Sequence, residues 1–324
     1  MKLPRLKGIE DACRRIRPYL PETPLVRSEV LSRAFAAEVW LKNETVSPIA
    51  SFKLRGALCE VLRARDVGFV QGVVTSSTGN HGQGVAFAAR QLGISAEVFL
   101  PVGANPLKKA MIRALGAVIR ETGRDLDEAK TEARAFAAAE GRLFVDDGDG
   151  LGVIEGAGTL ALEAARTLPR IDAMFVPMGS GALASGCAAA VKALHPRARV
   201  IAVQSTGAPA MVESFRAGRP VERPVQTLAD GLVCRVPAPL ALDALLALLD
   251  DALLATDEEL LAAMHTLVAC AHVLTEPAGA AALAGAWQMR HALTGQTVVF
   301  VLSGANVTSD LLRRALAERP FCEP

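Results

Sequence analysis

Three loops rich in glycine and serine carry residue types that can hold an anion. Each follows an apolar run: Ser-Ser-Thr-Gly-Asn-His-Gly at 76–82, Gly-Ser-Gly-Ala at 179–182 and Ser-Gly-Ala-Asn at 303–306. Glycine lets backbone N–H groups approach an anion, and a following helix N-terminus adds partial positive charge. A phosphate suits 179–182, although a tight turn between a strand and a helix explains these residues equally well. The donors of 76–82 suit a carboxylate.

A lone lysine, Lys53, follows Phe52 in a chain with 8 lysines and 27 arginines. A buried lysine loses its proton readily and can then form an imine or act as a base. Composition alone favours a solvated helix lysine, but the scarcity of lysine shifts the balance towards chemistry. For His81 a structural role is favoured over catalysis. The isolated acids Asp230 and Glu276 are either structural or part of a site.

The elements that must position these residues alternate between short β-rich runs and Ala-rich helical stretches. Continuous apolar runs are typical of parallel strands buried on both faces, so we expect an α/β fold with parallel-rich twisted sheets flanked by helices. Ligands bind beyond the carboxyl ends of such strands, which is where the three loops lie. The predicted strands are 39–42, 72–76, 96–101, 117–121, 143–146, 173–177, 200–204 and 297–302, and the predicted helices include 82–93, 106–116, 125–140, 156–167 and 181–194.

Four strand–helix units between residues 71 and 148 predict a small domain. It would interrupt a large domain formed by residues 1–70 and 149–324. The apolar run 237–254 contains three aspartates and is interpreted as one buried or amphipathic helix. These boundaries follow from the strand–helix rhythm and a turn-rich segment near 146–152.

Composition excludes several classes of function. With 35 Lys and Arg against 34 Asp and Glu, the net charge of +1 gives no general footprint for nucleic acid or an anionic membrane. Charged residues interrupt every candidate membrane span, and residues 1–17 lack the apolar core of a signal peptide. Six scattered cysteines indicate reduced thiols and a cytoplasmic location. The glycine spacing at 179–182 and the absence of an acid at Gln204 argue against a dinucleotide fingerprint.

Taken in order, the segments resemble the fold-type II pyridoxal-phosphate enzymes, specifically the threonine dehydratase and serine racemase branch with its two-domain, tryptophan synthase β-like fold. The resemblance covers nearly the whole chain. Its Ser-Thr-Gly-Asn-His form also resembles the hydroxyectoine-utilisation dehydratases. The matching segments are 23–25, 40–44, 51–57, 77–83, 229–231, 276–280 and 303–307, together with the loop 179–182.

The resemblance implies roles for individual residues. Lys53 would form the imine with pyridoxal 5'-phosphate and take the substrate's α-proton, and Thr78 is the second catalytic candidate. A serine rather than an aspartate at the pyridine nitrogen gives a weaker electron sink, which favours prompt loss of a β-leaving group. Cofactor-binding residues would be Phe52, Lys53, Asn80, Gly179, Ser180, Gly181, Ala182, Leu183 and Ser303, and substrate-binding residues Ser77, Thr78, Asn80, His81 and Gly231.

Several residues depart from the family pattern. Ala50 replaces the usual glycine before Ser51. Ser180 and Ala182 replace two of four glycines in the phosphate loop, so neither can adopt positive φ without strain. Thr78 stands where the racemase branch has a serine acting as base on the opposite face, and its bulk makes racemisation doubtful. Residues 204–210 lack the carboxylates of that branch's divalent-cation site, so no metal is expected.

We therefore expect an ammonia-lyase that eliminates water from L-threonine or L-serine, giving a 2-oxo acid and ammonia. Alternatives are a dehydratase of 3-hydroxyaspartate or of a hydroxyectoine-derived amino acid, and an amino-acid racemase. A nucleotide-dependent oxidoreductase and a non-catalytic vitamin-binding protein are hypotheses from other classes. The resemblance also implies a homodimer whose ligand is a small amino acid, and the charge and apolar runs predict no nucleic-acid or membrane partner.

Overall fold

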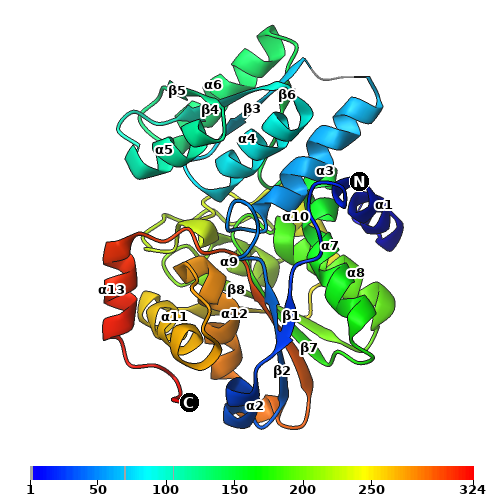
Figure 1. The fold of residues 1–324 in the computed structure, drawn as a ribbon, viewed down its shortest axis with the longest axis vertical. Helices are drawn as coiled ribbons and strands as arrows, with labels where there is room; N and C mark the ends of the chain where they lie inside the picture. Colours follow the sequence, from blue (N-terminus) through cyan, green and yellow to red (C-terminus); the bar gives the residue numbers. More distant parts are fainter. Residues whose placement is uncertain (1–2, 69–70, 105) are drawn as a thin grey trace.

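The computed structural model describes residues 3–68, 71–104 and 106–324, which form two separate sheets (Figure 1). The larger has the strand order β1-β2-β10-β7-β8-β9, and the smaller β5-β4-β3-β6. Within the described ranges every pairing between two named strands is parallel except that of β1 with β2. The strands are β1 Leu25–Arg27, β2 Glu38–Asn43, β3 Gly72–Ser76, β4 Ser95–Leu100, β5 Val118–Glu121, β6 Leu143–Phe144, β7 Ala173–Pro177, β8 Arg199–Ser205, β9 Asp251–Ala255 and β10 Thr297–Leu302.

Helices cover both faces of the large sheet. Successive residues of a strand point to opposite faces, so Val299 and Val301 of β10 pack in one core while Val298 and Phe300 pack in the other. The first core includes α1, α7, α8 and α10, and the second α2, α11, α12 and α13. The bounds are α1 Leu6–Ile16, α2 Glu29–Phe35, α7 Leu151–Thr167, α8 Ala182–Leu194, α9 Ala210–Ala217, α10 Pro239–Leu248, α11 Asp257–Ala271, α12 Pro277–Gln288 and α13 Ser309–Ala317.

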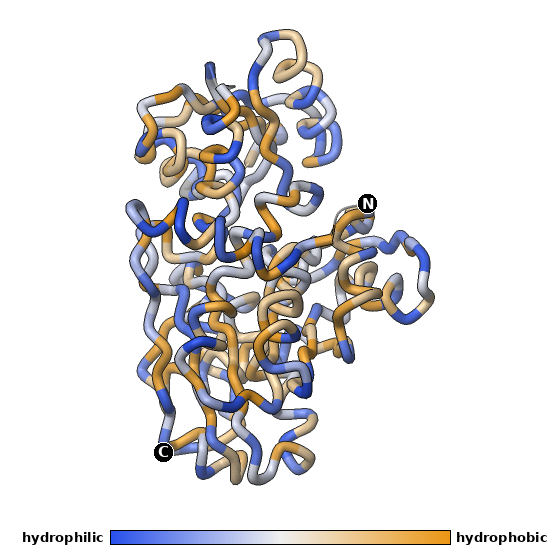
Figure 2. Tube along the Cα trace, turned by 90° about the vertical axis from the view of Figure 1, so that its right-hand side faces the viewer, coloured by the Kyte–Doolittle hydropathy of each residue, from blue (hydrophilic) through white to orange (hydrophobic). Residues whose placement is uncertain are grey.

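The small sheet is covered on one face by α3 (Lys53–Asp66), α4 (Asn80–Leu92) and α5 (Pro106–Ala114), and on the other by α6 (Leu126–Ala139). Its strands all lie within the predicted small domain, 71–148. The boundary predicted after residue 70 adjoins residues 69–70, which lie outside the described residues, and the domain division stays a prediction. Figure 2 shows the same two parts after a quarter turn, with hydrophobic segments running through the larger one.

All eight predicted strands are present, although β6 is shorter than predicted. The sequence did not predict β1. The prediction of one helix over residues 237–254 was wrong. The chain leaves α10 at Leu248 and enters β9 at Asp251, where it pairs with β8. Two short 3-10 helices, η1 (Asp230–Leu232) and η2 (Arg290–Leu293), complete the structure. Among the described residues, no helix combines the length and apolar character needed to cross a membrane.

Candidate active site

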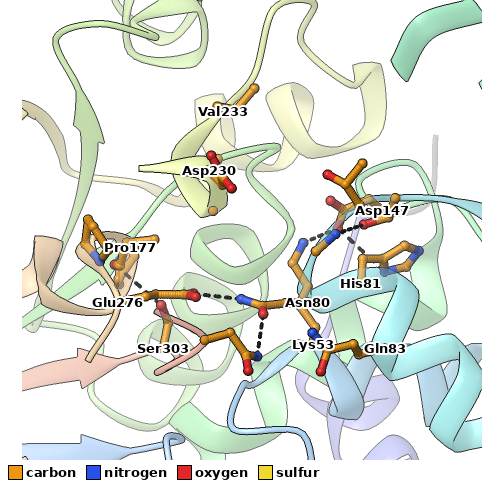
Figure 3. A pocket seen from close by; sticks show the side chains of 18 of the residues that line it. Lys53, Asn80, His81, Gln83, Asp147, Pro177, Asp230, Val233, Glu276 and Ser303 are labelled. Atoms are coloured by element: carbon orange, nitrogen blue, oxygen red, sulfur yellow. Dashed lines mark hydrogen bonds and ion pairs between the residues drawn. The ribbon is translucent and has the colours of Figure 1, made fainter. Parts of the chain in front are cut away.

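A cavity of about 490 Å³ lies beyond the carboxyl ends of the strands and draws its walls from both sheets (Figure 3). The structure brings every site residue predicted from sequence to its wall. It also adds Asp230 and Glu276, whose roles were open, Gln83 and Asn306, which lie in candidate segments but had no role, and Lys108 and Asp147, which sequence reasoning missed. The predicted residues at the wall are Phe52, Lys53, Ser77, Thr78, Asn80, His81, Gly179, Ser180, Gly181, Ala182, Leu183, Gly231 and Ser303.

A rigid turn before α3 sets the position of Lys53. Ser47 Oγ donates to Ser51 O at 2.9 Å and accepts from Ser51 N at 2.8 Å. Ala50 adopts φ +51°, in the left-handed region that glycine enters freely but alanine rarely does. Phe52 N then donates to Ser303 O at 3.0 Å, which joins the turn to the end of β10. Lys53 therefore starts α3 at a point fixed by the large sheet.

Close helix packing fixes the rest of α3. A Cβ at Gly156 of α7 would lie 2.5 Å from Arg55 O, and one at Gly84 of α4 would lie 3.0 Å from Lys53 O. A Cβ at Gly156 would therefore clash with the α3 backbone, and one at Gly84 would require that backbone to move by a few tenths of an ångström. Both neighbouring helices pack closely against α3.

The Lys53 ammonium faces the cavity and forms an ion pair with Asp147. The Lys53 side chain is 13% exposed, and its Nζ lies 5.3 Å from the centre of the Phe52 ring. Burial raises the pKa of Asp147, but the charge and hydrogen bond of Lys53 outweigh it, and the pKa is lowered to about 2. Asp147 is therefore a carboxylate throughout the neutral range.

His81 lies behind this pair. Burial lowers its pKa, so the ring is neutral at pH 7. Its Nε2 lies 3.1 Å from Val145 O, which can only accept, so the proton belongs on Nε2. Nδ1 is then a bare acceptor 3.7 Å from Asp147 Oδ1 and has no hydrogen-bond partner among the described residues. In this state His81 offers the cavity no N–H, and its predicted contact with a substrate carboxylate stays a prediction.

A chain of amides and one acid forms the opposite wall. Asn306 Nδ2 donates to Asn80 Oδ1 at 2.6 Å, and Asn80 Nδ2 donates to Glu276 Oε1 at 2.7 Å. Burial raises the pKa of Glu276 to about 7. Asn80 keeps one amide proton for a ligand, because an NH₂ group carries two donors.

The loop 179–182 forms a narrow floor at the N-terminus of α8. A Cβ at Gly179 would lie 2.7 Å from Gly231 O, and Gly181 adopts φ +93°. Ser180 and Ala182 avoid positive φ, as predicted. The first turn of a helix leaves backbone N–H groups without partners inside the helix, so this floor suits an anion.

Ser303 and the Asp230–Lys108 pair lie at other edges of the cavity. Ser303 is buried at the end of β10, with its Oγ 3.5 Å from Ala278 O. Lys108 of α5 forms an ion pair with Asp230 of η1, which links the two sides of the cavity mouth. In residues 3–68, 71–104 and 106–324 no group of three or more His, Cys, Asp or Glu side chains is arranged to hold a metal ion.

Known proteins match this chain over most of its length. The family model described as "Pyridoxal-phosphate dependent enzyme" matches residues 16–304. An L-threonine ammonia-lyase of Geobacter sulfurreducens is 36% identical over 301 residues, covering 92% of this chain and 75% of that protein. The chloroplastic threonine dehydratase 1 of Solanum lycopersicum is 36% identical over 296 residues, covering 90% of this chain, which spans only 49% of that relative.

Solved structures agree with the fold. The processed form of threonine deaminase isoform 2 from Solanum lycopersicum has a TM-score of 0.90 at 30% identity, covering 96% of this chain and 92% of that one. Serine racemase from Dictyostelium discoideum has a TM-score of 0.88 at 28% identity, covering 94% and 99%. The fold class and the cofactor predicted from sequence are confirmed. Lys53 and the loop 179–182 line one cavity, and the chain belongs to the family of pyridoxal-phosphate dependent enzymes.

Proposed function

We propose that this protein is an ammonia-lyase that removes water from a small β-hydroxy amino acid, L-threonine or L-serine, and releases a 2-oxo acid and ammonia. The single observation that carries the proposal is the Lys53 amine facing a cavity that the loops 76–82, 179–182 and 303–306 all line. The names of the threonine ammonia-lyase and threonine deaminase relatives support the reaction. The chain spans about half of the Solanum lycopersicum relative, so we argue the substrate from the residues of the cavity and not from that relative's name.

The cavity fits pyridoxal phosphate. Lys53 would hold its aldehyde carbon through Nζ, and the floor at 179–182 would receive its phosphate. Gly179 and Gly181 are required there by close approach and by φ, which leaves room for an anion at the backbone. Phe52, Asn80, Leu183 and Ser303 would flank the ring. When bound, the cofactor withdraws electrons from the substrate Cα and so makes the α-proton acidic.

The protein's own residues supply orientation and proton transfer. Ser77, Thr78 and Asn80 would hold the substrate carboxylate, since hydroxyl and amide donors gather where α4 begins. Lys53 would take the α-proton, because its amine would be released beside the substrate when the substrate replaces it on the cofactor. Gly231 would line the substrate's side-chain position, where a Cβ would lie 2.7 Å from that of Ala278. Thr78 would bound the opposite face and disfavour racemisation.

We also propose a homodimer in the cytoplasm. The six cysteines are all free, which supports a reducing compartment. The dimer is inferred from the family resemblance alone. Sedimentation velocity of the purified protein tests it, and a monomer at micromolar concentration would refute it.

A substrate panel tests the reaction. The purified protein, loaded with pyridoxal phosphate, is incubated with L-threonine, L-serine, 3-hydroxyaspartate and a hydroxylated 2,4-diamino acid. Release of 2-oxo acid and ammonia is followed, and chiral analysis of residual substrate detects racemisation. We expect the highest kcat/KM with L-threonine or L-serine. Faster turnover of another member would reassign the substrate, and D-serine as the main product would overturn the lyase assignment.

A further inference from the structure

We propose that Asp147 is the positioning residue for Lys53: it holds the lysine amine in place and balances its charge whenever that amine is free and protonated. The inference rests on the proposed function, since it assigns a partner to the lysine of that reaction. The observation behind it is an ion pair between Lys53 of α3 and Asp147, 94 residues further along the chain. The pair joins two parts of the fold at the cavity wall.

The backbone around Asp147 is held firmly. Asp146 Oδ1 accepts from Gly148 N at 3.0 Å and from Asp149 N at 3.2 Å, which closes the turn after β6. Ser180 Oγ donates to Asp147 O at 3.3 Å, and a Cβ at Gly148 would lie 2.9 Å from the Ser180 Cβ. The Asp147 carboxylate therefore has a defined place relative to the anion floor.

Lys53 is the natural counter-ion of Asp147. The groups that face Asp147 are Lys53 of α3, His81 of α4, Lys130 of α6 and the Cys234 thiol. Lys130 is already paired with Asp146 at 2.8 Å, and burial keeps His81 neutral at pH 7. Burial raises the pKa of the Cys234 thiol to about 12, so it too is uncharged.

This arrangement gives Asp147 a specific task. In the elimination the substrate Cα–H bond breaks and its proton moves to Lys53 Nζ, which becomes an ammonium. The electron pair of that bond forms the Cα=Cβ bond, and the β-hydroxyl leaves as hydroxide and takes up a proton to become water. A neutral site would disfavour that new charge, whereas the Asp147 carboxylate, already ionised, stabilises it. The same contact holds Nζ at one place while its other partner changes.

The test compares Asp147→Asn with the matched control Asp149→Asn, an exposed acid two residues away in the same turn. The whole chain of 324 residues, stripped of cofactor, is labelled briefly with acetic anhydride across a pH series. Mass spectrometry reads acetylation of Lys53, with the exposed Lys7 as internal reference. We expect Asp147→Asn to move the midpoint of Lys53 labelling down by about one pH unit or more. Asp149→Asn should leave it in place.

Two further readouts separate positioning from a merely structural role. In the loaded enzyme, Asp147→Asn should lower kcat by about tenfold or more while KM stays within about threefold, and Asp147→Glu should restore part of kcat. An unchanged Lys53 midpoint in Asp147→Asn overturns the inference, even if the variant is less stable. The labelling needs neither cofactor nor substrate, so its result tests the role of Asp147 independently of the proposed reaction.

Discussion

Helix α3 carries two cations two residues apart, and their surroundings differ sharply. Arg55 is 0% exposed and makes six hydrogen bonds, to Thr23, Glu44, Thr159 and Glu163, at 2.7–3.0 Å. Lys53 faces a cavity and has one carboxylate partner. Both charges are paired, but only the arginine has every donor direction occupied.

The difference shows how one helix can carry a charged side chain that stabilises the fold and another that is free to react. A guanidinium binds two carboxylates through its planar fork and does not lose its proton, and Glu44 and Glu163 raise its pKa further against the effect of burial. Lys42 completes that cluster, with Nζ 2.6 Å from both Glu163 Oε2 and Thr23 O. Lys53 has a single partner and space in front of it, so it can change partners. We expect substitutions at the two positions to affect opposite properties.

The largest effect should come from Lys53→Ala. Without the amine, the protein loses both its covalent hold on the cofactor and its base, so kcat/KM should fall by about 10³-fold or more. The free energy of unfolding should fall by about 1–2 kcal/mol, because Asp147 loses the cation that lowers its pKa although no core packing is lost. Ammonia release and urea denaturation measure the two quantities. Lys109→Ala, outside the cavity and paired with Glu121, should keep full activity.

The converse variant is Arg55→Gln. It leaves Glu44 and Glu163 buried without their arginine, so the free energy of unfolding should fall by about 3–5 kcal/mol. The control is Arg15→Gln, which removes a half-exposed ion pair with Asp66 at the other end of α3 and should cost less than about 1 kcal/mol. Equal losses in the two variants would show that the buried cluster is not what fixes α3.

Glu276 extends the comparison to a buried acid. Its partner is the amide of Asn80, whereas the acids beside Arg55 and Lys53 are paired with cations. Its pKa of about 7 lies above the value in the unfolded chain, so the folded state binds the proton more tightly. The stability from this group is complete below about pH 4.5 and is lost as pH rises to about 7, a fall of about 3 kcal/mol. In Glu276→Gln that fall should be absent from urea denaturation measured between pH 5 and 8. An identical pH profile in both proteins would contradict the shift.

Much of this molecule could be predicted from sequence. The strands β3, β7 and β10 match their predicted bounds, because continuous apolar runs ended by Gly or Ser leave little choice. The loops that follow these three strands line the cavity, and their Gly and Ser residues were the signal that predicted the site. The run 237–254 misled, because periodicity cannot distinguish a short apolar strand from the end of a buried helix. Asp250 and Asp251, where β9 begins, were the available signal.

Asp147 was missed for a different reason. Its local sequence is a turn rich in Gly and Asp, which is typical of any loop. Its meaning comes from the approach of that turn to Lys53, which depends on how the small sheet packs beside α3. The Arg55 cluster was equally hidden, since Arg55 and Glu163 are 108 residues apart in the sequence. Ion pairs between residues far apart in the sequence depend on the tertiary arrangement, and the identity of a single residue does not predict them.

The smallest effect concerns the backbone that presents Lys53. Ala50 has φ +51°, which costs about 1–2 kcal/mol for an alanine, whereas glycine loses about 0.5–1 kcal/mol more entropy on folding. Ala50→Gly should therefore raise the free energy of unfolding by about 1 kcal/mol or less. Ala36→Gly, at φ +49° after α2 and far from the cavity in sequence, should gain a similar amount. If kcat/KM falls in Ala50→Gly alone, the strained turn is part of what holds Lys53 in place. If both keep full activity, the hydrogen bonds from Ser47 and Ser303 suffice.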